Sequence, residues 1–137
     1  MKVSFIIPAY NEEKYLPAVL WTLSDEIARQ GSGFDYEIIV VDNASTDCTR
    51  EVAESFPNVR VVTELRKGSS FARQAGFEKA SGEILVFFDA DIRVPAGWIG
   101  TMLSEIKKPD VVAVSGPYIY YDLPSPWRTV AWPYAVI

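Results

Sequence analysis

The chain has 137 residues, of which 49% are hydrophobic and 23% charged, and its formal net charge is −5. This balance is typical of one globular domain with a substantial core, and the acidic charge argues against binding to a nucleic-acid backbone. The chain contains no histidine and one cysteine, Cys48, which excludes an imidazole ligand, an intramolecular disulfide and a multi-cysteine zinc site. Any acid–base or metal chemistry must therefore use carboxylates.

The N-terminal stretch predicts a strand followed by a helix. Val3 to Ile7 is an apolar run ended by Pro8, and in the polar loop that follows Asn11 can cap a helix. Apolar residues then recur at helical spacing until about Gln30. This N-terminus is unlike a signal peptide and no stretch approaches the length of a membrane span, so we expect a cytoplasmic protein or one at the cytoplasmic face of a membrane.

Strands and helices alternate along the rest of the chain. The predicted strands cover residues 3–7, 37–41, 59–63, 84–88 and 111–115, and the helices between them end near residues 30, 55, 80 and 106. Ser45 or Thr46 is expected to cap the second helix, and the third presents a face of small residues that includes Gly76. The alternation predicts an α/β fold: a Rossmann-like sandwich with a mainly parallel central sheet, right-handed crossovers and helices on both faces.

Two aspartates follow the fourth predicted strand. Ile84 to Phe88 is an uninterrupted apolar run, typical of a strand buried on both faces, and Asp89 and Asp91 come directly after it. Ligands of open α/β sheets bind outside the carboxyl ends of the strands, and side chains at i and i+2 of an extended chain point the same way. The pair is suited to a divalent cation, Mg²⁺ or Mn²⁺, that bridges to phosphate oxygens. The alternative is a pair of solvated turn residues.

Polar residues also follow the first two strands. Tyr10 can stack on a planar base, and Asp42 can accept a hydrogen bond from a base N–H or a ribose hydroxyl. The amino end of the helix that begins near Ser69, with Lys67 and Arg73, offers positive potential for phosphate. Because the carboxyl ends of parallel strands share one edge of the sheet, these groups predict a nucleoside diphosphate site there.

Each of these residues also has a plainer structural role open to it. Tyr10 can simply cover the edge of the sheet, and Asp42 and Asp47 can form turns and caps. Arg73 can pair with Glu78 or another helix neighbour. No glycine-rich phosphate loop follows the first strand and the Walker pattern is absent, which weighs against a nicotinamide or flavin enzyme.

Four blocks, residues 3–13, 37–47, 72–76 and 82–91, carry a resemblance when they are taken together in this order. They resemble glycosyltransferase family 2. The resemblance implies a GT-A fold over residues 1–116, a UDP- or GDP-linked nucleotide-diphospho-sugar donor, Mg²⁺ or Mn²⁺ as cofactor, and inversion at the sugar carbon. By position it implies a donor-nucleotide site lined by Pro8, Ala9, Tyr10, Glu12, Asp42, Arg73, Asp89 and Ala90, with Asp91, helped by Asp89, on the metal.

The composition changes after Gly116, because six aromatic residues and four prolines fall in the last 21 residues. We expect residues 117–137 to begin an acceptor-side or membrane-associated part of a longer protein; the alternative is a tail that packs back across the sheet. Family members carry their acidic general base further along the chain, so we expect that residue beyond Ile137. Asp122 is a weak candidate for the catalytic base.

The function predicted is that of the donor-binding part of an inverting, metal-dependent glycosyltransferase. Its acceptor is a lipid, a polysaccharide or a protein, nucleic acid is not a partner, and residues 117–137 make a peripheral membrane contact. Two alternatives stay open. One is a nucleotide-sugar-binding module without turnover, because no general base is visible. The other is a sugar nucleotidyltransferase, an enzyme that needs a basic, glycine-rich loop after the first strand to hold a triphosphate. Residues 9–13 at that position are acidic, which argues against this alternative.

Overall fold

The computed structural model describes residues 1–116. The chain divides into a unit of residues 1–96 and a second unit that begins at Gly97, and each is described by itself. The first unit holds the strands β1 (Lys2–Ala9), β2 (Asp35–Asp42), β3 (Val59–Thr63) and β4 (Ile84–Phe87), and the helices α1 (Leu16–Gln30), α2 (Thr49–Glu54) and α3 (Ser69–Lys79), with a 3-10 turn at Gly31–Gly33. The second unit holds α4 (Trp98–Ile106).

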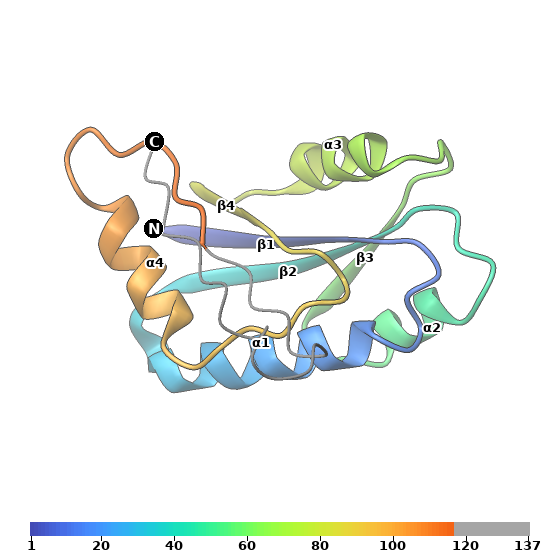
Figure 1. Ribbon diagram of the computed structural model, residues 1–137, viewed down its shortest axis with the longest axis horizontal. Coiled ribbons are helices and arrows are strands. Elements are labelled where there is room, and N and C mark those ends of the chain that lie inside the picture. The colour runs from blue at the N-terminus through green and yellow to red at the C-terminus, as the bar shows by residue number, and fades with distance from the viewer. Residues whose placement is uncertain (117–137) are drawn as a thin grey trace, which may run out of the picture. The chain divides into compact units, whose positions relative to one another are not determined.

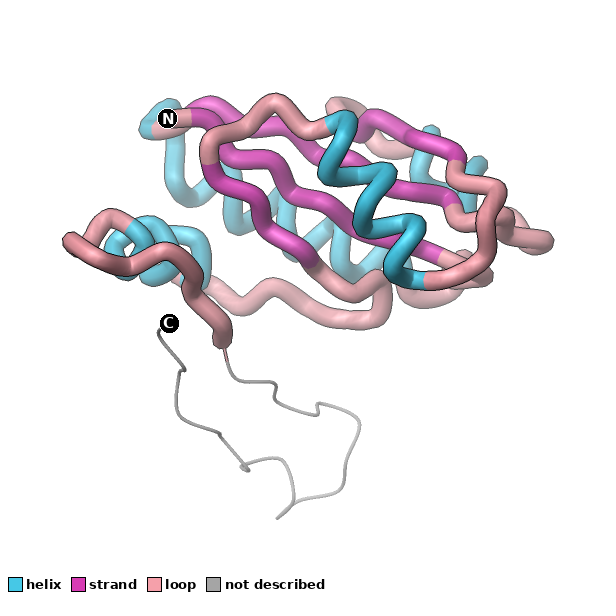
Figure 2. The backbone as a smooth tube through the Cα atoms, turned by 90° about the horizontal axis from the view of Figure 1, so that it is seen from above, coloured by secondary structure: helices cyan, strands magenta, loops and turns pink. Residues whose placement is uncertain are grey.

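The four strands form one parallel sheet in the order β3-β2-β1-β4. Helix α3 covers one face of this sheet, and α1 and α2 lie on the other (Figures 1 and 2). This confirms the predicted α/β sandwich with helices on both faces. The register aligns Ala9 of β1 with Asp42 of β2, and Asp42 with Thr63 of β3, so the carboxyl ends of these three strands lie at one edge.

The core forms on both faces of β1 and β2, whose apolar residues alternate between them. On the α3 side, Ile6 and Val41 pack with Ala72 of the helix. A Cβ added at Gly76 would lie 2.4 Å from Cγ2 of Ile6 and 3.1 Å from Cγ2 of Val41, so glycine is what lets α3 approach the sheet this closely. On the other side α1 contributes the fully buried residues Leu16, Val19, Leu20 and Leu23.

The expectation that the fourth strand is buried on both faces is wrong. Among residues 1–116, strand β4 lies at the end of the strand order, and Phe87 in it is 40% exposed. The backbone N–H of Phe88 still donates to the carbonyl of Ile6, and its ring stacks on Phe5 at a centroid distance of 6.0 Å. A continuous apolar run does not reveal whether a covering element lies over both faces of its strand.

The fifth predicted strand is not formed over residues 111–115. Among them only Val114 makes an isolated β-bridge, none belongs to the four-stranded sheet, and Val112 is 83% exposed. A short run of β-branched residues favours a strand only where a partner strand and a buried face are available. No helix in the part of the chain that the structure describes has the length and apolar character needed to cross a membrane.

Candidate functional site

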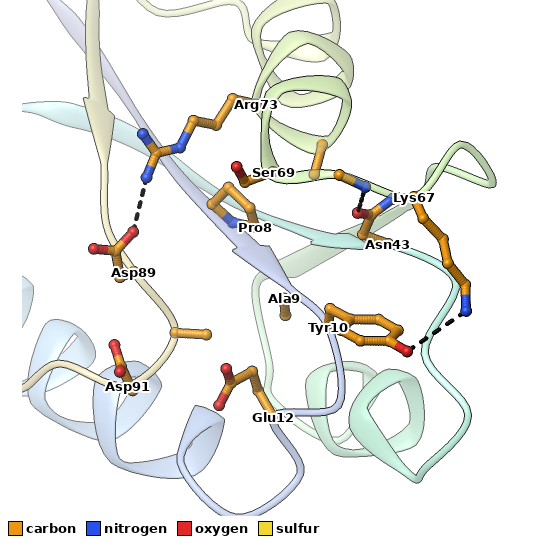
Figure 3. Close-up of a pocket in the computed structure, with 13 residues that line it drawn as sticks. Pro8, Ala9, Tyr10, Glu12, Asn43, Lys67, Ser69, Arg73, Asp89 and Asp91 are labelled. Carbon is orange, nitrogen blue, oxygen red and sulfur yellow. Dashed lines mark hydrogen bonds and ion pairs between the residues drawn. The ribbon is translucent and has the colours of Figure 1, made fainter.

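A pocket of about 520 Å³ opens at the carboxyl ends of β1 and β4, beside the amino end of α3 (Figure 3). Its lining combines segments that are far apart in the sequence. The lining residues are Pro8, Ala9, Tyr10, Glu12, Asn43, Lys67, Gly68, Ser69, Ala72, Arg73, Asp89, Ala90 and Asp91. A cavity therefore lies at the edge of the sheet where the sequence predicts the site. All the predicted site residues of the first unit except Asp42 line it.

One side of the pocket is acidic. Asp89 and Asp91 follow β4, and Glu12, from the loop after β1, lies near Asp91 (Figure 3). Burial, and then repulsion from Asp91 and Asp47, raise the pKa of the Glu12 carboxyl above its usual value. The site thus concentrates negative charge in a way that a bound cation would relieve.

Arg73 bridges this acidic side to α3. Its Nη2 lies 2.8 Å from Oδ1 of Asp89, and the two side chains are about half exposed, at 48% and 47%. The suggested pairing of Arg73 with Glu78 is wrong, because Glu78 accepts a hydrogen bond from Gln74 instead. Within the helix, Arg73 has a carboxylate five residues away in Glu78, whereas the fold brings the carboxylate of Asp89, just after β4, within reach.

The loop that leads into α3 is held by Asn43, a residue that sequence reasoning did not select. Its Nδ2 donates to the carbonyls of Glu64 and Arg66, at 3.0 and 2.7 Å, and its Oδ1 accepts from the N–H of Gly68 at 2.9 Å. Hydrogen bonds from the Arg66 side chain and backbone lower the pKa of Glu64 to about 2. A buried amide that satisfies three backbone groups fixes this loop, and with it the position of Lys67.

Lys67 and Tyr10 meet on the side of the pocket away from the aspartates (Figure 3). The Lys67 Nζ lies 3.5 Å from the Tyr10 hydroxyl oxygen and 5.2 Å from the centre of the ring. That distance is within the range of a cation–π interaction. Tyr10 is 47% exposed, so its ring is accessible to a planar ligand.

The loop after β1 is braced against the loop after β2. The Oδ1 of Asn11 accepts from the N–H of Thr46, and the N–H of Glu12 donates to Oγ1 of Thr49. Asn11 adopts a left-handed φ of 55° and is not the N-cap of α1, since that helix begins at Leu16. The expected N-cap is therefore wrong, because the Asn11 side chain is used between loops.

Asp42 is the predicted site residue that the structure does not place in the pocket lining. It is 7% exposed, and its Oδ1 accepts from the N–H of Ser45 at 3.1 Å, which is the turn role considered for it. The expected cap at Ser45 or Thr46 is wrong, since α2 begins at Thr49 and the N–H of Thr49 donates to Asp47. A base-binding role for Asp42 stays a prediction. Asp122 lies outside the described residues.

Comparison with known proteins shows to which family the chain belongs. The family model described as "Glycosyl transferase family 2" matches residues 4–134. The chain belongs to this family. One curated relative of this family 2 chain is a dolichol-phosphate mannosyltransferase of Pyrococcus furiosus, which is 36% identical over 87% of this chain and 34% of the relative. Another is an undecaprenyl-phosphate 4-deoxy-4-formamido-L-arabinose transferase of Pseudomonas fluorescens, which is 35% identical over 77% of this chain and 32% of the relative. The chain therefore spans about a third of the length of these relatives.

Solved structures agree with the family and its GT-A-type fold. Residues 1–349 of TarS from S. aureus in complex with UDP match with a TM-score of 0.64 and 30% identity, over 77% of this chain and 32% of that one. Glucosyl-3-phosphoglycerate synthase of Mycobacterium tuberculosis, in complex with Mn²⁺, UDP and phosphoglyceric acid, matches with a TM-score of 0.67 and 25% identity, over 85% and 43%. The GT-A-type sandwich predicted from the sequence is confirmed.

Three carboxylates of the family 2 pocket are of the kind that could hold a magnesium or manganese ion. Asp89, Asp91 and Glu12 are hard oxygen donors that line the same cavity. Among residues 1–116 no group of three or more potential ligands gathers closely enough to hold an ion by itself. Mg²⁺ typically binds through one or two carboxylates together with substrate phosphates and waters, so this donor set fits a cation that arrives with a diphosphate.

Replacing Glu12 by Gln is expected to stabilise the unliganded domain at neutral pH. The raised pKa of Glu12 means that the charged carboxylate is less favourable in the folded state than in the unfolded state. This penalty is absent below the ordinary value of 4.5, where Glu12 is protonated in both states, and it grows as the pH rises through the raised folded value. We expect a gain of about 0.5 kcal/mol near neutral pH, discounted for solvent screening, and none below about pH 4. Urea unfolding at both pH values measures it.

Glu78→Gln is the matched control for this substitution. Glu78 is exposed on α3, accepts a hydrogen bond from Gln74 at 2.9 Å and does not line the pocket. It should show no gain in stability that appears with rising pH. If Glu12→Gln changes the free energy of unfolding equally at both pH values, the charge of Glu12, through its burial and its repulsion from Asp91 and Asp47, is not the cause.

Proposed function

We propose that this family 2 domain binds a nucleoside-diphosphate sugar in the described pocket and serves a glycosyltransferase that moves the sugar to an acceptor. The observation that carries the proposal is the convergence of Asp89, Asp91 and Arg73 with the amino end of α3 at the carboxyl edge of a parallel sheet. Carboxylates for a cation, an arginine and free helix N–H groups are the parts that a diphosphate requires. The UDP bound in the TarS and glucosyl-3-phosphoglycerate synthase structures supports the same ligand class.

In this proposal the diphosphate lies between Ser69, Arg73 and the aspartates, and the base lies toward Tyr10. Asp91, helped by Asp89, would hold Mg²⁺ or Mn²⁺. A cation bound there would act as a Lewis acid that offsets the charge of the diphosphate. Arg73 and the first N–H groups of α3 would add positive potential on the opposite side of the phosphates.

The reaction proposed is a direct displacement with inversion. The acceptor oxygen forms a bond to the anomeric carbon, the bond from that carbon to the diphosphate oxygen breaks, and the nucleoside diphosphate leaves with the electron pair. A base takes the acceptor proton. Four curated relatives have dolichol phosphate, dolichyl phosphate or undecaprenyl phosphate in their names, which favours a lipid phosphate among the possible acceptors and a site of action at a membrane surface.

Calorimetric titration with UDP and with GDP, in the presence and absence of Mn²⁺, tests the donor site. We expect binding of at least one nucleotide that strengthens when Mn²⁺ is added. A folded sample that binds neither nucleotide at millimolar concentration would overturn the proposal. Donor hydrolysis and transfer to a polyprenyl phosphate then distinguish an enzyme from a binding module, because a module binds the nucleotide and releases no sugar.

A further inference from the structure

We infer that Lys67, held by Tyr10, donates a hydrogen bond to a carbonyl group on the edge of the donor's base. The pocket then prefers a keto base such as uracil to an amino base such as cytosine. This inference rests on the proposed function, since it assigns a base to the same pocket. It concerns residues whose side chains meet at the rim and which the diphosphate chemistry does not use.

The position of Lys67 is fixed from two sides. Its backbone lies between Arg66 and Gly68, both of which hydrogen-bond to the buried side chain of Asn43. Its ammonium lies 3.5 Å from the Tyr10 hydroxyl oxygen and 5.2 Å from the centre of that ring. A lysine on an exposed loop ordinarily samples many rotamers, and these contacts favour the one that lies along the pocket wall.

The distribution of charge in the pocket decides which part of a nucleotide reaches this wall. Asp89 and Asp91 lie on one side of the pocket, with Arg73 above them, whereas Tyr10 and Lys67 lie on the other (Figure 3). A diphosphate that shares a cation with the aspartates must lie on their side. The other end of the ligand, the base, then extends toward the exposed ring of Tyr10 and the ammonium of Lys67.

The chemistry of an ammonium group sets the preference. Lys67 offers three N–H donors and no acceptor, so it complements a carbonyl oxygen and not an exocyclic amino group. Uracil carries a carbonyl at its position 4 where cytosine carries an amino group, and both carry a carbonyl at position 2. The inference therefore places position 4 of the base toward Lys67. A hydrogen bond from a charged donor contributes about 1.5 kcal/mol or more, which corresponds to a preference for UDP over CDP of about tenfold.

The test compares the dissociation constants of UDP and CDP for the parent chain and for Lys67→Met, measured by calorimetry with Mn²⁺ present. Methionine keeps the length and apolar stem of the side chain and removes the ammonium. We expect the UDP affinity to fall about tenfold and the CDP affinity to change less than about twofold, so that the ratio approaches one. Lys79→Met is the matched control, because Lys79 is an exposed lysine of α3 outside the pocket lining, and it should leave both affinities unchanged.

Other outcomes identify what is wrong. If Lys67→Met weakens UDP and CDP by the same factor, Lys67 acts on the phosphates and the inference is overturned while the proposed function stands. If the parent chain binds UDP no better than CDP, the base preference is wrong in the same way. If the folded parent chain binds no nucleoside diphosphate, the proposed function fails and the inference fails with it.

Discussion

Replacing Asp91 by Asn is expected to abolish the cation-dependent part of nucleotide binding while the fold stays intact. Asp91 is exposed at the pocket and follows β4, so the substitution keeps the size of the side chain and removes only its charge. Loss of a residue that merely supports a metal ligand lowers metal affinity by about 10- to 100-fold, so loss of the main ligand should lower UDP affinity about 100-fold when Mn²⁺ is present. With EDTA present, the variant should bind UDP weakly, but no more weakly than the parent, because it lacks one negative charge that repels the diphosphate.

Asp35→Asn is the control for this experiment. Asp35 is an exposed aspartate at the start of β2, at the opposite end of the sheet from the pocket, where it pairs in register with Lys2. It should bind UDP as the parent does under both conditions. An Asp91→Asn variant that keeps the parent's response to Mn²⁺ would show that the cation is held elsewhere.

The elements that the sequence predicts well are those in which the local pattern and the tertiary role agree. Strand β3 and helix α3 begin and end close to the predicted residues, because an apolar run or helical spacing is bounded by glycine, proline or polar turn residues. Residues 111–115 have a comparable apolar pattern without a place in the sheet. Only the pairing of strands separates the two cases, and pairing is not encoded in a short window.

For the side chains of the site, too, some features can be predicted from the sequence and others cannot. The sequence predicts which strand ends converge, since a parallel sheet brings its carboxyl ends to one edge, and for this reason Tyr10, Asp89 and Asp91 can be expected to share the pocket that they line. It does not predict what a polar side chain contacts across the chain. Asp42 turns back to its own loop, and Asn43, its neighbour, supports the segment that carries Lys67. The signal available for Asn43 was only its position at a strand end.

Replacing Arg73 by Met is expected to change the binding of cations and nucleotides in opposite directions. In the parent, Arg73 donates to Asp89 at 2.8 Å and so offsets part of the negative charge that Asp89 and Asp91 bring to the pocket. Without the guanidinium the pocket is more negative. Mn²⁺ alone should then bind a few-fold more tightly, whereas UDP without a cation should bind about tenfold more weakly, because it loses a charge-assisted contact and is repelled. Titration of each ligand separately measures the two effects.

Arg29→Met is a closely matched control, because Arg29 also makes an ion pair of 2.8 Å, with Asp25, and both members of that pair are exposed on α1 away from the pocket lining. An exposed pair contributes little to stability, so both variants should unfold within about 1 kcal/mol of the parent, and only the Arg73 variant should alter ligand binding. If Arg73→Met weakened Mn²⁺ and UDP binding together, the cause would be a distorted pocket. If it changed neither, Arg73 would be a structural partner of Asp89 with no part in binding the diphosphate. If the charge of Arg73 acts on both ligands, the two affinities must shift in opposite directions. Loss of one positive charge favours a bound cation and disfavours a bound anion, so it cannot weaken the binding of both.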